Sequence, residues 1–160
     1  METIDYIQQY LTQCVACSEQ LLAMLERERN ALSNQSAKEL ENTAFEKKLL
    51  ADIIDKQTKE CSQRLEQEGY GQGPQSISTF IQQATAEDAQ QELSTLWQSL
   101  QENLGHCQDK NRLNGRVLES SQKRIKQAID ILHGQTPDGE LYGRAGKTVS
   151  DSKAHTLSRA

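Results

Sequence analysis

Apolar residues recur at spacings of three, four and seven along most of the chain, a pattern typical of amphipathic helices. In the first stretch the recurring positions are Ile4, Ile7, Leu11, Cys14, Leu21, Leu25 and Leu32. Their near-heptad period predicts one helix from about Thr3 to Leu32. The polar residues 33–36 then interrupt the pattern.

A second helix is predicted from about Ala37 to Glu68. Ser36 and Glu39 have the spacing of a capping box, in which the serine oxygen accepts the N3 amide and the glutamate reaches back. The apolar seam of this helix is predicted to be Leu40, Ala44, Leu50, Ile54, Cys61 and Leu65, widened by Phe45, Leu49 and Ile53. Because the connection is short, the first two helices should be antiparallel neighbours.

Three glycines and a proline between Gly69 and Pro74 break the helical pattern. A short helix is predicted from Ser78 to Ala84, and a third long helix from about Ala86 to Leu132. At 1.5 Å per residue the third helix would be roughly 70 Å long, against about 45 Å for each of the first two. Its end should therefore overhang its partners, unless it kinks near Gly105 or Gly115.

The predicted fold is all-α: an elongated antiparallel bundle of three long helices plus one short helix, followed by a flexible C-terminal tail. The bundle domain should cover residues 1–134, because Gly134, Pro137 and Gly139 end the last helix. Residues 135–160 form the C-terminal segment, of which residues 143–160 are too polar to bury a core.

Composition narrows the classes of function. Only 35% of the 160 residues are hydrophobic and 4% aromatic, which suits the narrow apolar stripes of a bundle better than a thick globular core. The net charge of -5 disfavours nucleic-acid binding, which needs clustered Lys and Arg. We find no apolar run near the roughly 20 residues of a membrane span and no signal-peptide pattern at the N-terminus. These features predict a cytoplasmic protein with reduced cysteines.

The chain shows no catalytic constellation, so we expect no enzyme activity, cofactor, metal or small-molecule substrate. Cys14 and Cys17 have CxxC spacing, but the βαβ context of a redox motif is missing. A zinc site using these two residues with His106 or Cys107 is an alternative. Cys14, Cys61 and Cys107 fall on the predicted seams, which favours their burial as small hydrophobic residues.

The glycine-rich residues 140–149 end in Gly146, Lys147 and Thr148, as a phosphate-binding loop does. Such a loop needs a further glycine at position 141, which is Leu141, and it joins a strand to a helix. This segment is therefore a tether, a disordered end or a docking motif.

The amphipathic run from Val117 to Leu132 is the strongest functional signal, because an exposed apolar helix face usually marks an interaction site. Such a face typically receives another amphipathic helix. The alternatives are that it folds into the bundle or pairs with its own copy. Just before it, Asn114 lies on or near the seam, where an asparagine can fix the register of helices at a cost in stability. A tolerated imperfection or kink beside Gly115 is the other interpretation.

Three elements follow one another here: Asn111-Arg-Leu-Asn114-Gly115, the amphipathic run, and Leu141-Tyr-Gly-Arg-Ala-Gly-Lys-Thr148. This succession resembles the FlgN family of flagellar type III export chaperones. In that family an Asn-x-x-Asn-Gly element opens a C-terminal amphipathic helix, and a Leu-Tyr-Gly-x-x-Gly-x-Thr segment follows it.

The resemblance implies a chaperone that binds the C-terminal amphipathic region of the hook-associated proteins FlgK and FlgL, prevents their premature assembly and delivers them for export. By position, the cargo-facing residues would be Val117, Leu118, Ile125, Ala128, Ile129 and Leu132. Leu141, Tyr142 and Gly143 match the segment associated with docking to the export gate protein FlhA, and components of the export ATPase complex are further expected partners. The alternative is a structural coiled-coil protein without cargo that self-associates through residues 117–132.

Overall fold

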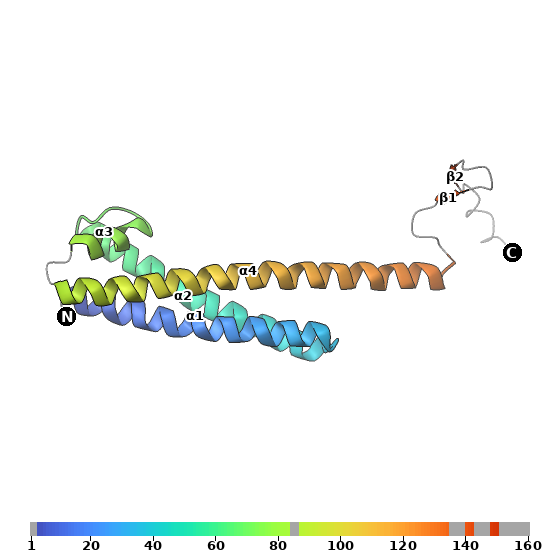
Figure 1. Ribbon diagram of the computed structural model, residues 1–160, viewed down its shortest axis with the longest axis horizontal. Coiled ribbons are helices and arrows are strands. Elements are labelled where there is room, and N and C mark those ends of the chain that lie inside the picture. Colours follow the sequence, from blue (N-terminus) through green and yellow to red (C-terminus); the bar gives the residue numbers. More distant parts are fainter. Residues whose placement is uncertain (1–2, 84–86, 135–139, 143–147, 151–160) are drawn as a thin grey trace. The chain divides into compact units, whose positions relative to one another are not determined.

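The computed structural model describes residues 3–83, 87–134, 140–142 and 148–150, and for the last two segments it describes the backbone alone. The described part holds four helices, in the order α1 (Thr3–Ser33), α2 (Ala37–Gln67), α3 (Gln75–Gln83) and α4 (Glu87–Leu132) (Figure 1). This confirms the predicted all-α bundle, and the bounds of the three long helices agree with the sequence pattern to within one residue. Within the described residues, no helix is long and apolar enough to cross a membrane.

The chain forms two compact units, Met1–Gly115 and Arg116–Ala160, and the division falls within α4. The first unit contains α1, α2, α3 and the beginning of α4. Neither Gly105 nor Gly115 interrupts α4, which is a single helix of 46 residues, against 31 residues in each of α1 and α2. The domain boundary predicted after residue 134 stays a prediction.

In the turn between α1 and α2, Ser36 contributes both to the end of α1 and to the start of α2. Gln35 adopts the left-handed conformation with φ of 54°, and the amide of Ser36 donates back to the carbonyl of Ala31 at 3.0 Å. The Ser36 hydroxyl then accepts the amide of Glu39 at 3.4 Å and caps α2. The capping box is only half formed, however, because the Glu39 carboxylate binds Arg27 of α1. That ion pair links α1 to α2 close to the turn.

The end of α2 is closed by a Schellman motif around Gly69. This glycine has φ of 89°, its amide donates to Glu66, and the amide of Tyr70 donates to the carbonyl of Leu65 at 2.9 Å. The Tyr70 ring meets Phe80 edge to face, with 5.1 Å between the ring centroids. The glycine-rich break therefore both stops α2 and directs the chain into α3.

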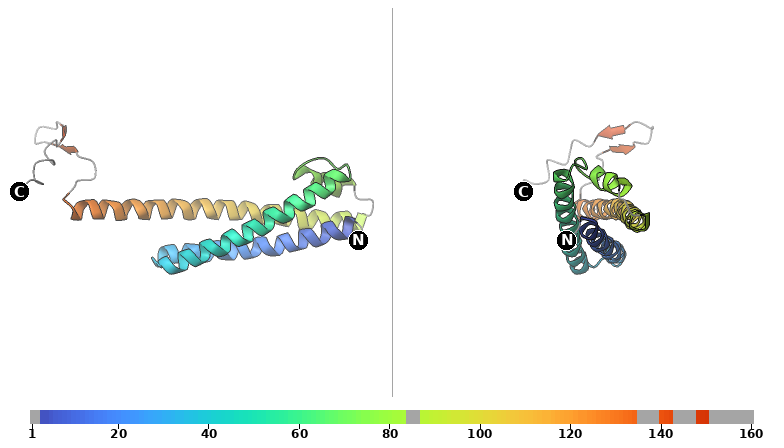
Figure 2. Two further views of the ribbon diagram at one scale, coloured as in Figure 1. Left: turned by 180° about the vertical axis from the view of Figure 1, so that it is seen from behind. Right: turned by 90° about the vertical axis from the view of Figure 1, so that its left-hand side faces the viewer.

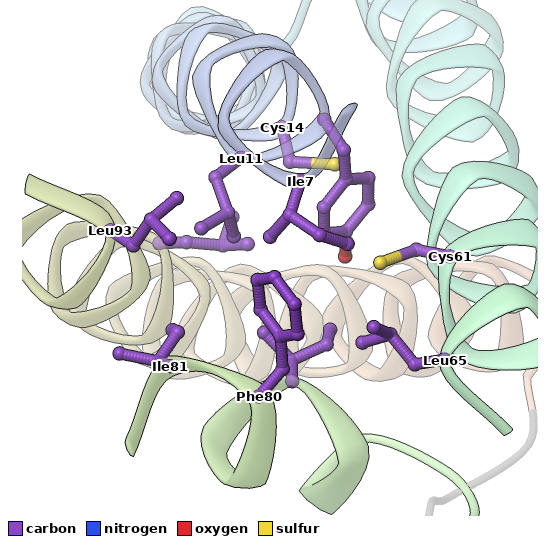
Figure 3. Close-up of a cluster of buried hydrophobic side chains, with 11 residues drawn as sticks. Ile7, Leu11, Cys14, Cys61, Leu65, Phe80, Ile81 and Leu93 are labelled. Atoms are coloured by element: carbon purple, nitrogen blue, oxygen red, sulfur yellow. The ribbon is translucent and has the colours of Figure 1, made fainter. Parts of the chain in front are cut away.

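The larger core lies at the end of the first unit where all four helices meet (Figure 3). Its buried residues are Ile7, Tyr10, Leu11, Cys14, Cys61, Leu65, Ile77, Phe80, Ile81, Leu93 and Leu100. Figure 2 shows α3 covering this end of the α1, α2 and α4 arrangement. A smaller core follows along the same three long helices, built from Leu21, Leu25, Ile54 and Cys107. The short helix thus supplies apolar cover that the three long helices lack at one end.

Within the first unit, α4 runs in the same direction as α1. Gln8 donates to Glu92 and Asn103 donates to Ser18, and the partners are 84 and 85 residues apart in the two contacts. A constant separation along both helices requires a parallel arrangement. The up-down-up order of the three long helices is therefore the antiparallel bundle that the short α1–α2 connection predicted.

The sequence prediction was wrong about one face of α2. Phe45, Leu49 and Ile53 were expected to widen the buried seam, but their side chains are 66%, 48% and 43% exposed. Thr43 is buried instead, at a position that periodicity in apolar residues does not detect. Phe45 lies two residues beyond Thr43, which is about 200° around a helix, so the two cannot share a face. Ala44 of the predicted seam is exposed as well.

Two short strands lie near the C-terminus, β1 (Glu140–Tyr142) and β2 (Thr148–Ser150). They pair antiparallel, with Leu141 opposite Val149 and Tyr142 opposite Thr148. No strand was predicted here from the sequence, although two runs of β-favouring residues separated by a short glycine-containing link indicate a hairpin. The remaining residues of the predicted flexible tail lie outside the described residues.

Candidate functional site

The second unit carries an exposed apolar stripe on α4. No described side chain from Arg116 to Leu132 is buried, although several are large and apolar. The exposed fractions are 41% for Leu118, 61% for Ile125, 46% for Ile129 and 84% for Leu132. Val117 is half-buried and Ala128 is exposed. The α4 stripe is defined here as Val117, Leu118, Ile125, Ala128, Ile129 and Leu132.

Helical geometry places these residues on one side of α4. Leu118, Ile125 and Leu132 are seven residues apart, or nearly two turns, so they lie almost in line. Ile129 is four residues after Ile125 and three before Leu132, which places it on the same side. Ile131 is 64% exposed and lies at the edge of the stripe, about 100° round the helix from Leu132 and three residues after Ala128.

Charge around the α4 stripe differs from charge in the rest of the chain. Residues 116–134 contain four basic residues, Arg116, Lys123, Arg124 and Lys126, against the two acidic residues Glu119 and Asp130. The net charge of this segment is therefore +2, while the whole chain carries -5. The positive charge of this segment favours a partner helix that carries acidic residues.

A hydrogen-bonded network holds α4 to α1 and α2 at the end of the first unit. The side-chain amide of Asn114 donates to the Leu25 carbonyl at 2.9 Å and to Glu28 Oε2 at 2.8 Å. Lys47 Nζ donates to Glu28 Oε1 at 2.8 Å and to Asn111 Oδ1 at 3.0 Å. We call the four side chains Glu28, Lys47, Asn111 and Asn114 the polar clasp. Both asparagines of the Asn-x-x-Asn-Gly element therefore make contacts within the fold.

The polar clasp decides between the two interpretations of Asn114. This side chain is 4% exposed, and its amide contacts one backbone and one charged acceptor on α1, so it fixes the position of α4 along α1. It does not mark a kink, since α4 continues through it. For Gly115 the structure offers no steric reason, because an added Cβ would meet no atom within 4 Å.

Sequence reasoning missed Glu28 and Lys47, which appeared only as charges on helix faces. The sequence did contain an indication that these two residues lie close together. An antiparallel hairpin with its turn near residue 35 brings position 28 of α1 close to position 47 of α2, and the two charges are opposite. Their carboxylate and ammonium are 2.8 Å apart in the structure.

The cysteines are packed as apolar side chains. Burial raises the pKa of the Cys14 thiol to about 11 and that of Cys61 to about 12, and it also raises the pKa of Cys107. Such thiols stay protonated near neutral pH, which makes them poor nucleophiles and poor metal ligands. Cys14 belongs to the larger core, whereas Cys17 packs against the smaller one. Among the described residues, no three His, Cys, Asp or Glu side chains lie close enough together to hold a metal ion.

The C-terminal motif falls only partly within the described residues. Leu141 and Tyr142 lie in β1, where their backbone pairs with β2. Gly143 lies outside the described residues. Their side chains thus stay candidates identified by the sequence motif.

Comparison with known families matches residues 1–150 to the family described as FlgN protein. No curated protein and no solved structure matches the chain. The match spans the bundle, the Asn-x-x-Asn-Gly element, the α4 stripe and the paired strands. The chain therefore belongs to the FlgN family, a family of flagellar export chaperones.

Proposed function

We propose that this protein is a cytoplasmic export chaperone whose α4 stripe binds the C-terminal amphipathic region of the hook-associated proteins FlgK and FlgL. Covering that region would keep the cargo from assembling before export. The chaperone would then carry its cargo to the export gate. It would act by binding alone, without a cofactor.

The exposure of the α4 stripe is the observation that carries this proposal. Its four large side chains are between 41% and 84% exposed on a helix that has no covering element among the described residues. Fully burying a Leu or Ile side chain contributes about 1.5–3 kcal/mol, so covering what is now exposed would contribute several kcal/mol in total. Part of that gain is offset by lost freedom of both partners. The net affinity would therefore be moderate, which suits a chaperone that must release its cargo.

Replacing Ile125 and Ile129 together with aspartate should weaken binding of a peptide from the C-terminus of the cognate FlgK at least 100-fold, and the same is expected for FlgL. Each substitution removes an apolar contact and places a charge in the interface. A 100-fold loss corresponds to about 2.7 kcal/mol, less than two buried isoleucines can contribute. Calorimetric titration of the full-length protein measures the change.

Gln127→Asp is the matched control, because it adds a negative charge to the same helix two residues from both Ile125 and Ile129, about 200° round the helix from each. Its affinity should stay within about threefold of the wild type, and far-UV circular dichroism should show equal helicity in all variants. Equal losses in both variants would remove the stripe as the cargo site. If the wild type bound neither peptide and formed an oligomer that the double variant lost, the self-associating coiled-coil alternative would replace the chaperone proposal.

We further propose that Leu141, Tyr142 and Gly143 dock on the cytoplasmic domain of FlhA. A tyrosine offers a large contact area at a small cost in side-chain entropy, which is why tyrosines often dominate interfaces. The backbone pairing of β1 with β2 supports the proposal, because a segment already held in one conformation loses less entropy on binding. Components of the export ATPase complex are further candidate partners.

Tyr142→Ala should weaken binding to the isolated cytoplasmic domain of FlhA at least tenfold, while FlgK peptide binding stays unchanged. Loss of a hot-spot aromatic typically costs about 2 kcal/mol or more, which exceeds the 1.4 kcal/mol of a tenfold change. Surface plasmon resonance with the cargo-loaded chaperone measures this. Tyr142→Phe is the control and should retain most of the affinity. An unchanged affinity in Tyr142→Ala would exclude the tyrosine as the anchor.

A further inference from the structure

The three long helices of the first unit leave a pocket beside the smaller core. Its volume is about 340 Å³, which is within the range of small-molecule sites. The floor is apolar and is formed by Leu21 and Leu25 of α1, Ala51 of α2, and Leu104 and Cys107 of α4. None of the described residues of α3, the helix that covers the larger core, lines it. We call this space the three-helix pocket.

The polar side chains of the three-helix pocket can all donate hydrogen bonds. Lys47 and Lys48 line it from α2, and Gln108 and Asn111 line it from α4. Asn111 uses its Oδ1 to accept from Lys47, which leaves the amide nitrogen as the group that it offers to a ligand. No Asp or Glu is among the described residues that line the pocket. An apolar floor is therefore combined with donors and positive charge.

Lys48 supplies the positive charge that is not already matched within the pocket. Lys47 is paired with Glu28 at 2.8 Å, so its ammonium is largely neutralised. Lys48 is exposed and makes no ion pair among the described residues. Its ammonium can reach the mouth of the pocket while its aliphatic stem covers part of the apolar wall.

The acidic residues closest in sequence to the lining residues do not replace a ligand carboxylate. Asp55 of α2 and Asp109 of α4 are each paired with a basic residue of their own helix, at 2.7 Å and 3.0 Å. Asp52 lies about 100° round α2 from Ala51, on the side of Lys48 that faces away from the pocket. The donors that line the pocket thus face no carboxylate of the same lining.

We propose that the three-helix pocket binds a small aliphatic carboxylate of the fatty-acid type. The alkyl chain packs on Leu21, Leu25 and Leu104, and the carboxylate accepts hydrogen bonds from Lys48 and from the amide nitrogen of Asn111. Both parts of the ligand are needed. The chain covers the apolar floor, and the donors satisfy the charged head, which would be costly to bury without partners.

The size of the pocket favours a small ligand over a helix of another protein. Its lining extends over residues 104–111 of α4 and 47–51 of α2, which is about 10 Å and 6 Å of helix. By comparison, α3 is nine residues long and buries three large apolar side chains to cover the larger core. A pocket this short holds one apolar chain.

Calorimetric titration of the full-length protein with octanoate, below its micelle-forming concentration, tests the proposal. We expect saturable binding of one octanoate per chain. Octanoate should also raise the Tm followed by circular dichroism, because the ligand binds the folded chain and not the unfolded one. 1-Octanol has the same chain without the charge and should bind at least threefold more weakly. The absence of saturable octanoate binding would overturn the proposal.

Two substitutions separate the floor from the charged donors. Ala51 is exposed, so Ala51→Trp should fill the pocket from its edge and weaken octanoate binding at least tenfold. Lys48→Met keeps the aliphatic stem and removes the charge, so it should weaken octanoate binding at least threefold and leave 1-octanol binding unchanged. Lys56→Met is the matched control, because Lys56 lies on the same helix with its side chain 78% exposed and does not line the pocket.

The α4 stripe is a second apolar surface that could take up octanoate, so it needs its own control. Octanoate affinity should be unchanged in Ile125→Asp with Ile129→Asp. If binding were lost in that double variant and kept in Ala51→Trp, the ligand would lie on the α4 stripe and the proposal would be wrong. Equal affinity in the wild type, Ala51→Trp and Lys48→Met would also overturn it. None of these outcomes depends on cargo or gate binding.

Discussion

Leu11→Ala is expected to lower the free energy of unfolding by about 3–4 kcal/mol. Leu11 is 0% exposed and lies in the larger core, where all four helices of the first unit meet. Removing its isobutyl group leaves a cavity that residues on four separate elements would have to close together. Because the same core contains the bulky Phe80 and Leu93, only partial collapse is expected, and the loss should lie near the middle of the range of about 2–5 kcal/mol for such substitutions.

Urea unfolding followed by far-UV circular dichroism measures this loss. Leu113→Ala is the matched control, because it makes the same chemical change on α4 at a side chain that is 50% exposed. We expect that control to change the free energy of unfolding by no more than about 0.5 kcal/mol. Equal losses in the two variants would contradict the packing of the first unit.

Asn114→Ala should lower the free energy of unfolding by about 2 kcal/mol, the second largest effect we expect. The substitution removes two hydrogen bonds, one of them to the Glu28 carboxylate, and hydrogen bonds to charged groups contribute about 1.5–3 kcal/mol. It also leaves that carboxylate, which is only 12% exposed, with Lys47 as its remaining partner among the described residues. The position of α4 along α1 should become less well defined.

Asn111→Ala provides the comparison within the same sequence element. Asn111 is exposed and accepts a single hydrogen bond from Lys47, so its loss should cost less than about 0.5 kcal/mol. Comparing the free energies of urea unfolding of the two variants would show whether Asn114 stabilises the fold and Asn111 does not. If Asn114→Ala kept full stability but lost FlgK peptide binding, the asparagine would belong to the cargo site and the structural role of the polar clasp would be wrong.

The helices of this protein follow closely from local sequence. The starts and ends of α1, α2 and α4 were predictable because apolar periodicity, Ser36 and the glycines at 69 and 134 act over a few residues. The strand pair β1–β2 was not predicted because the segment is rich in glycine, which is depleted in strands, although Tyr142, Thr148 and Val149 favour strands. For α2, periodicity alone included Phe45, Leu49 and Ile53 in the seam, since it records apolar residues without recording what covers them.

The candidate site was predictable in its residues but not in its surroundings. Sequence indicated an amphipathic run from Val117 to Leu132, and a motif indicated the segment around Tyr142. Neither could show that the α4 stripe is exposed, because exposure depends on which other helices reach that part of α4. The partners of Asn114 could not be identified either, since Leu25 and Glu28 lie far from it in the chain and meet it only in the folded bundle.

The sequence by itself determined that the chain is helical, where the three long helices begin and end, and which family it belongs to, because these depend on local spacing and short motifs. It placed the start of α3 at Ser78, three residues after the observed start at Gln75. Only the tertiary structure decided which apolar faces are covered. The same periodicity places Leu11 in a core, Leu49 on the surface of α2 and Ile125 on an exposed stripe. A helix face becomes buried only when a second element packs against it, and the residues of that face do not specify which element this is.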